Sequence, residues 1–176
     1  NAFGWDRKLR YLYHKIPNSS LFVRTGSGLT YENTSDDGIK TQIIIYAPIS
    51  IKKGIENNSK FSEDIEEMFE FKDYNIGELN DMGGKKPQML HKIDLKRANI
   101  GGVDGFRGTL IWEDKYEKCI TDNYASNVII KGKKYRYSTK VRFKGDVDEV
   151  SFEQLEGRRY YFRPLINKMF STIKVY

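Results

Sequence analysis

Apolar and polar residues alternate strictly along residues 135–144, which is the most regular pattern in the chain. A period of two places alternate side chains on opposite faces of a β-strand. Residues 128–130 and 135–143 flank Lys131-Gly132-Lys133, and this arrangement predicts a β-hairpin. One face of the second strand would carry Tyr135, Tyr137, Thr139, Val141 and Phe143, and the other Arg136, Ser138, Lys140, Arg142 and Lys144.

Other segments rich in β-branched and aromatic residues predict further strands. Residues 21–32 predict a strand that is interrupted at Gly26-Ser27-Gly28. The turn signal Asp36-Asp37-Gly38 then precedes residues 41–47, which are apolar enough to form a strand that is buried on both faces. Two more strands are predicted on either side of a glycine-rich turn, at residues 88–97 and 106–112.

Three segments predict helices. The aromatic and basic residues near the start favour a short helix that ends before Ile16-Pro17. Ser62 is typical of an N-cap, and Ile65, Met68 and Phe69 follow it at helical spacing. A C-terminal helix is predicted with Pro164 in its first turn, followed by a short final strand within residues 171–176. Its apolar face would comprise Leu165, Ile166, Met169, Phe170 and Ile173.

These elements predict an α+β fold, in which a mostly antiparallel sheet packs in layers with two or three helices. A length of 176 residues suits a single domain, expected over residues 3–176, with Asn1-Ala2 resembling the remnant of a cleaved tag. No stretch approaches the apolar length of a membrane-spanning helix. The single Cys119 excludes an internal disulfide and a cysteine-based zinc site, and is expected to be a structural residue.

The formal net charge of +6 comes from one segment. Seven cations and no acids lie within residues 131–144, and the rest of the chain carries 23 basic and 24 acidic residues. An acidic run stands against this segment, formed by Glu63, Asp64, Glu66, Glu67 and Glu70. The chain is therefore near-neutral with one basic stretch.

A row of cations on one strand face can bind an acidic protein surface, acidic lipid or phosphates. It can also be a solvated outer face whose charges discourage pairing at a sheet edge. The aromatic residues of the same strand would point the other way, which argues against base stacking beside phosphate contacts. The predicted partner-binding residues are Lys133, Lys134, Arg136, Lys140, Arg142 and Lys144.

A second candidate site comprises Asp104, Glu113 and Lys115. The spacing resembles the PD-(D/E)xK nuclease pattern, in which two carboxylates hold Mg²⁺ and a lysine orients water or stabilises charge. These three residues are the alternative catalytic set of a magnesium-dependent nuclease. No nucleotide or cofactor fingerprint is present, so no cofactor is expected.

Two stretches of the chain resemble PsbP-like domains. Residues 99–109, with the sequence NIGGVDGFRGT, resemble the glycine turn and following strand of that family, and residues 160–175 resemble its closing helix and short tail. The C-terminal half of immunity proteins against type VI secretion lipase effectors is similar in the same places. The resemblance implies an α/β/α sandwich, exported or lipid-anchored, that acts by binding, with a positive φ at Gly101 or Gly102 for the turn.

The function expected is therefore that of a non-catalytic, exported bacterial interaction protein, in particular an immunity protein that neutralises a secreted effector. Its partner would be a protein, bound through the basic strand face or through the acidic segment near residue 65. The alternatives are the nuclease and a protein that binds nucleic acid without cleaving it. A periplasmic or lipid-anchored location is expected on this reading, with a cytoplasmic one left open.

Overall fold

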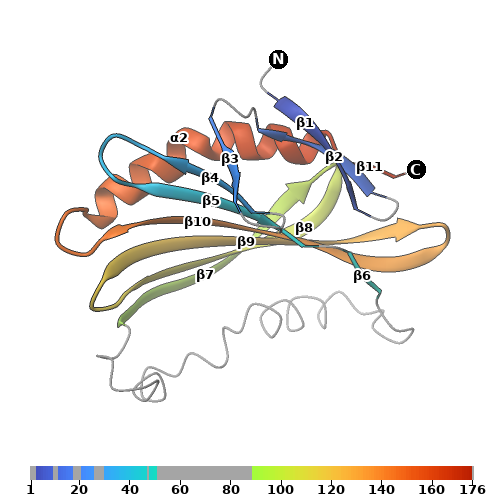
Figure 1. Ribbon diagram of the computed structural model, residues 1–176. Helices are drawn as coiled ribbons and strands as arrows, with labels where there is room; N and C mark the ends of the chain where they lie inside the picture. The colour runs from blue at the N-terminus through green and yellow to red at the C-terminus, as the bar shows by residue number, and fades with distance from the viewer. Residues whose placement is uncertain are drawn as a thin grey trace.

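The computed structural model describes residues 3–9, 12–17, 21–25, 30–46, 48–50 and 89–175. These residues form two antiparallel sheets and one long helix, α2, which lies across one face of the larger sheet (Figure 1). The larger sheet has eight strands in the order β3-β4-β5-β10-β9-β8-β7, with β6 beside β10. Its strands are β3 (Val23–Thr25), β4 (Thr30–Thr34), β5 (Lys40–Ile45), β6 (Ile49–Ser50), β7 (Met89–Ile100), β8 (Val103–Glu113), β9 (Glu117–Ile130) and β10 (Lys133–Asp146).

The hairpin predicted around residue 132 is confirmed, and it is the longest among the described residues, because its first strand extends well before the predicted residues 128–130. β9 and β10 pair over their full fourteen residues, from Lys133 opposite Ile130 to Asp146 opposite Glu117. Lys131 and Gly132 connect them with φ values of 49° and 75°. Two successive residues with positive φ form the tight turn whose twist matches that of the strands.

The glycine turn between β7 and β8 is built in the same way. Gly101 and Gly102 have φ values of 63° and 82°, which confirms the positive φ expected there. The two glycines have different surroundings. A Cβ on Gly101 would lie 2.9 Å from the Phe170 carbonyl oxygen, whereas nothing lies within 4 Å of one on Gly102. The turn therefore packs directly against the C-terminal end of the helix.

The helix α2 (Phe152–Ser171) begins well before the predicted start, and the placement of Pro164 in its first turn was wrong. Ser151 is the N-cap, and it exchanges hydrogen bonds with Gln154 in a capping box. Pro164 lies inside the helix. The cap and the buried stripe on the sheet side fix the start of the helix, and the stripe comprises Leu155, Arg159, Phe162, Ile166, Met169 and Phe170.

The helix predicted near the start of the chain was also wrong. β1 (Phe3–Leu9) and β2 (Leu12–Pro17) form an antiparallel hairpin there. The final strand is confirmed, because β11 (Lys174–Val175) pairs with β2 and completes a three-stranded sheet. The Lys15 backbone N–H also donates to the Thr172 hydroxyl at 2.9 Å. Pairing with the distant C-terminus thus accompanies strand formation in a segment whose local composition favoured a helix.

The core lies between the larger sheet and α2. The Phe170 ring contacts Tyr124 of β9 at 4.8 Å and Tyr137 of β10 at 6.4 Å between ring centroids. The strand β5 alternates, with Thr41, Ile43 and Ile45 buried, so the prediction of burial on both of its faces was wrong.

The expected α+β class with a mostly antiparallel sheet is confirmed, with one helix among the residues that the structure describes. The predicted helix near residues 62–72, including its acidic run, lies outside the described residues. The second helical layer of an α/β/α sandwich therefore remains a prediction.

Candidate functional site

The basic strand occupies an interior position in the sheet. β10 pairs with β9 on one side and with β5 and β6 on the other. Its residues alternate as predicted: Tyr137, Thr139, Val141 and Phe143 are buried on the side that α2 covers, and the positions between them are half-buried. We use the name basic face for the six predicted partner-binding cations, although Lys133, beside the turn, lies on the other side of the strand from the remaining five. The six are Lys133, Lys134, Arg136, Lys140, Arg142 and Lys144.

Acidic and amide side chains of the same sheet contact part of the basic face. The Lys144 ammonium lies 3.6 Å from a Glu117 carboxylate oxygen, and the Arg136 Nε donates to the Asn127 side-chain oxygen at 3.4 Å. Lys133 and Lys134 differ from the others because they lie at the exposed tip of the hairpin. The tip is therefore the most accessible part of the basic face.

The structure does not bring the candidate nuclease residues together. Asp104 is the second residue of β8 and Glu113 is its last, so they are nine positions apart along the extended strand. At about 3.3 Å per residue the two Cα atoms are about 30 Å apart, and an odd spacing places the side chains on opposite faces. Lys115 follows in the next turn, with its ammonium 5.5 Å from the centre of the Tyr116 ring.

A magnesium ion cannot be shared by carboxylates this far apart. Within the described residues, no three His, Cys, Asp or Glu side chains come close enough to hold a metal ion. The geometry therefore does not support a PD-(D/E)xK centre made from Asp104, Glu113 and Lys115.

Cys119 is fully buried on β9, and its sulfur lies 3.4 Å from the Thr121 hydroxyl. Burial raises the pKa of its thiol to about 11. A buried thiol that stays protonated is a poor nucleophile. These properties suit the structural role that was expected.

A buried ion pair between the helix and the sheet was not predicted from the sequence. The Arg159 guanidinium of α2 donates to both carboxylate oxygens of Asp122 on β9, at 2.6 and 2.9 Å. Thr109 of β8 bridges the pair, because its hydroxyl donates to Asp122 at 2.6 Å and accepts from Arg159 at 3.0 Å. The other end of the guanidinium donates to Glu156 at 2.6 Å. Only 3% of the Asp122 side chain and 9% of the Arg159 side chain are exposed.

The surroundings favour the charged form of Arg159. Burial alone would lower the pKa of Arg159, but the hydrogen bonds and charges of Asp122 and Glu156 raise it above its usual value. Burial, together with the charge of Asp122, raises the pKa of the neighbouring Tyr124 to about 12. The network is enclosed between helix and sheet, so its evident role is to fix the position of α2.

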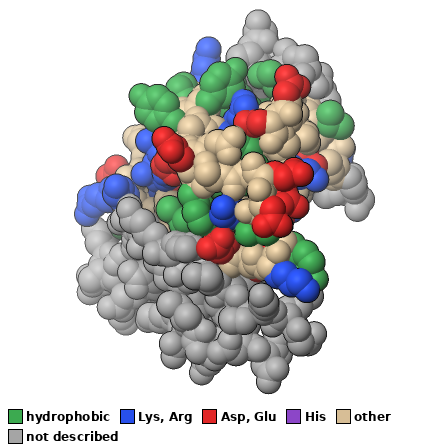
Figure 2. Space-filling view, turned by 90° about the vertical axis from the view of Figure 1, so that its left-hand side faces the viewer, with side chains coloured by type: hydrophobic (Ala, Val, Ile, Leu, Met, Phe, Trp, Pro, Cys, Tyr) green, Lys and Arg blue, Asp and Glu red, His purple; other side chains and the backbone are tan. Residues whose placement is uncertain are grey.

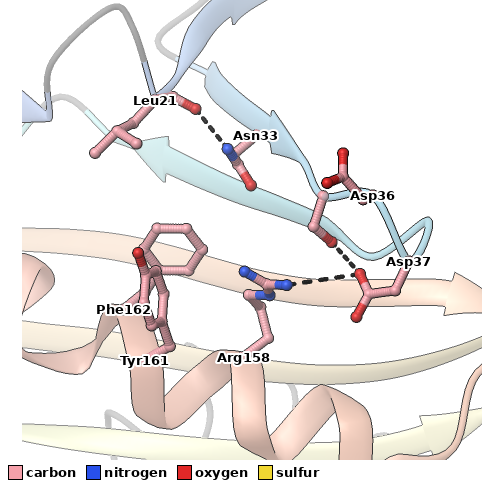
Figure 3. Close-up of a pocket in the computed structure, with 8 residues that line it drawn as sticks. Leu21, Asn33, Asp36, Asp37, Arg158, Tyr161 and Phe162 are labelled. Carbon is pink, nitrogen blue, oxygen red and sulfur yellow. Dashed lines mark hydrogen bonds and ion pairs between the residues drawn. The ribbon is translucent and has the colours of Figure 1, made fainter.

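A groove runs along the side of α2 next to β3 and β4. One hollow of about 380 Å³ is lined by residues from α2 and from the β4–β5 turn, and Figure 3 shows Arg158 reaching from the helix towards Asp37. A second hollow of about 370 Å³ shares Leu21, Tyr161 and Phe162 with the first. We call the two together the α2 groove. They share three lining residues, so the groove is continuous along the helix.

Acidic residues gather at the end of the larger sheet where the β4–β5 turn lies (Figure 2). The connections at this end are the β4–β5 turn, the β8–β9 turn and the segment before α2, because β5, β8, β9 and β10 all have a terminus there. The basic hairpin tip lies at the opposite end of β10 (Figure 1). Among the residues that the structure describes, acids are therefore concentrated at one end of the long strands, and the two lysines of the hairpin tip lie at the other. The acidic residues in these connections are Asp36, Asp37, Asp114, Asp146, Asp148 and Glu149.

No protein-family model and no curated protein matches the chain. No helix among the described residues is both long enough and apolar enough to cross a bilayer.

Proposed function

We propose that the protein is a non-catalytic interaction protein that binds an acidic surface of a partner protein through the basic face. The observation that carries this proposal is the interior position of β10. Lysines on an edge strand protect the sheet from pairing with other chains. From Tyr135 to Lys144 strand β10 has neighbours on both sides, so the four cations of that stretch do not serve that purpose.

The distribution of aromatic residues favours a protein partner over single-stranded nucleic acid. Proteins that bind single strands stack bases on aromatic rings beside the cations. The tyrosines and the phenylalanine of β10 alternate with its cations, and Tyr137 and Phe143 are buried on the opposite side. Charge complementarity without stacking is typical of protein–protein recognition.

The finer part of the proposal concerns the class of partner. We infer an exported or lipid-anchored bacterial protein whose partner is a secreted effector that it neutralises. The support is the resemblance of residues 99–109 and 160–175 to PsbP-like domains and to immunity proteins. The two positive-φ glycines at Gly101 and Gly102 agree with the turn that this resemblance implies.

The sharpest test uses the exposed tip of the basic face. Arg136, Lys140 and Arg142 are half-buried, so reversing their charge would combine lost binding with lost stability. Lys133→Glu/Lys134→Glu changes only exposed positions. The matched control is Lys115→Glu/Lys174→Glu, which alters two other exposed lysines and lowers the net charge equally.

The three proteins are cross-linked in an extract of the organism that expresses the chain, and the captured proteins are identified by mass spectrometry. We expect one acidic protein to be captured by the wild type and the control and to be lost with the tip variant. Equal capture by the wild type and both variants would show that the hairpin tip does not bind the partner. Capture that disappears after nuclease treatment of the extract would assign the basic face to nucleic acid.

A further inference from the structure

The α2 groove combines an apolar floor with an exposed aromatic wall. Phe162 forms the floor and is 3% exposed, and its ring meets Phe22 edge-on at 5.3 Å between centroids. Tyr161 and Leu21 line both hollows and remain 65% and 41% exposed. Large aromatic side chains held in the open beside a hollow are the type of residue that contributes most to protein–protein binding.

The two ends of the groove carry opposite charges. Asp36 and Asp37 stand at one end with Arg158, whose guanidinium lies 3.6 Å from the Asp37 carboxylate, and Lys168 stands at the other. A hydrogen bond from the Ser35 hydroxyl, with the charge of Arg158, lowers the pKa of Asp37. Asp36 makes no hydrogen bond or ion pair with any residue that the structure describes, so its charge is available to a ligand.

The length of the groove suits a short extended peptide. The helix rises about 1.5 Å per residue, so the ten steps from Arg158 to Lys168 span about 15 Å. An extended chain covers that distance in four or five residues. Arg158, Tyr161, Leu165 and Lys168 recur at spacings of three and four residues, which places them along one side of the helix.

We propose that the α2 groove binds an extended peptide segment of a partner protein that carries a basic side chain two positions before an aromatic one. The basic side chain pairs with Asp36, and the aromatic side chain occupies the hollow above Phe162, between Tyr161 and Leu21. An acidic group at the far end of the segment pairs with Lys168. This site goes beyond the proposed function, because it lies on the helix and shares no residue with the basic face.

The test uses the pentapeptide Arg-Ser-Phe-Ser-Glu, with acetyl and amide ends, and the full ¹⁵N-labelled chain. Two comparison peptides replace either the phenylalanine by serine or the arginine by glutamate. We expect saturable shifts of the Leu21, Asp36 and Tyr161 amide signals with the first peptide. Each comparison peptide should bind at least about tenfold more weakly, because it lacks either the aromatic or the charged contact.

Two pairs of variants locate the site. Tyr161→Ala removes the exposed wall of the groove, whereas Tyr160→Ala removes a neighbouring tyrosine that is 75% exposed and lines neither hollow. We expect the first to weaken binding of the pentapeptide at least about fivefold and the second to leave it unchanged. A second pair tests the charge: Asp36→Asn should weaken binding of the pentapeptide, and the exposed control Asp148→Asn should leave it unchanged. This pair keeps the test valid if the Tyr161→Ala variant does not fold.

Three results would overturn the proposal. One is equal binding of all three peptides, and another is an equal loss in the Tyr160→Ala and Tyr161→Ala variants. The third is a dimer in sedimentation velocity that Tyr161→Ala dissociates, because the groove would then belong to a second copy of the chain. None of these results bears on the basic face, which the Lys133 and Lys134 variant tests separately.

Discussion

The buried pair of Asp122 and Arg159 should contribute far more to stability than the exposed pair that shares the same arginine. Asp122→Asn preserves shape but removes the negative charge that receives two hydrogen bonds from a guanidinium that is 9% exposed. Breaking one partner of a buried pair costs about 3–5 kcal/mol. Glu156→Gln removes the other carboxylate that Arg159 contacts, at the same distance of 2.6 Å, but that side chain is 50% exposed. Its loss should cost less than about 1 kcal/mol.

Urea unfolding followed by circular dichroism measures both values. In a chain of this length each kcal/mol shifts the melting temperature by about 2–4 °C, so Asp122→Asn should lower it by about 6 °C or more. The double variant Asp122→Leu/Arg159→Met removes both charges and should be more stable than Asp122→Asn alone. Equal losses for Asp122→Asn and Glu156→Gln would refute the claim that burial makes the inner pair important.

Two further predictions concern glycine and cysteine positions. Gly102→Ala should lower the free energy of unfolding by about 1 kcal/mol, because of its positive φ alone. Gly101→Ala should lower it by at least about 1 kcal/mol more, because its Cβ would meet the Phe170 carbonyl oxygen. Equal free energies of unfolding for the two variants would contradict this. Cys119 should resist thiol reagents in the native protein at pH 8. Its pKa of about 11, in place of the ordinary 9.0, lowers the fraction of thiolate about a hundredfold. Rapid labelling of the native protein would contradict this, because it would show that the thiol is accessible. Because folding raises this pKa, the thiol destabilises the fold only as the pH rises above 9 towards 11, which stability measurements compared with Cys119→Ala can follow.

Local signals in the sequence were enough to predict the turn of the long hairpin and its second strand, but only the last three residues of its first strand, β9. The alternation along β10 and the residues Lys131-Gly132 define that strand and its turn within residues 131–144. The N-terminal hairpin pairs within residues 3–17 and also with β11 at the other end of the chain. No Asn-Gly, Asp-Gly or Gly-Gly turn signal stands between its two strands, so the local sequence was interpreted as a helix.

The candidate sites likewise differ in how far the local sequence predicts them. The cations of β10 are visible in the sequence, but the interior position that makes them informative follows from pairing with β5 and β9. Asp122 lies in a part of β9 that was not predicted as a strand, and its partner Arg159 lies 37 residues away in the sequence, so nothing local pointed to the pair. The α2 groove has no sequence signature at all, because Leu21 and Tyr161 meet only when β3 and α2 are in place.

The central claim is that the exposed cations of the basic face bind an acidic protein. The most direct test is isothermal titration of the purified captured partner into the tip variant Lys133→Glu/Lys134→Glu and into the control Lys115→Glu/Lys174→Glu, at one salt concentration. The account predicts that the tip variant binds at least about tenfold more weakly than the wild type and that the control binds as the wild type does. Equal affinities for the two variants would contradict the account.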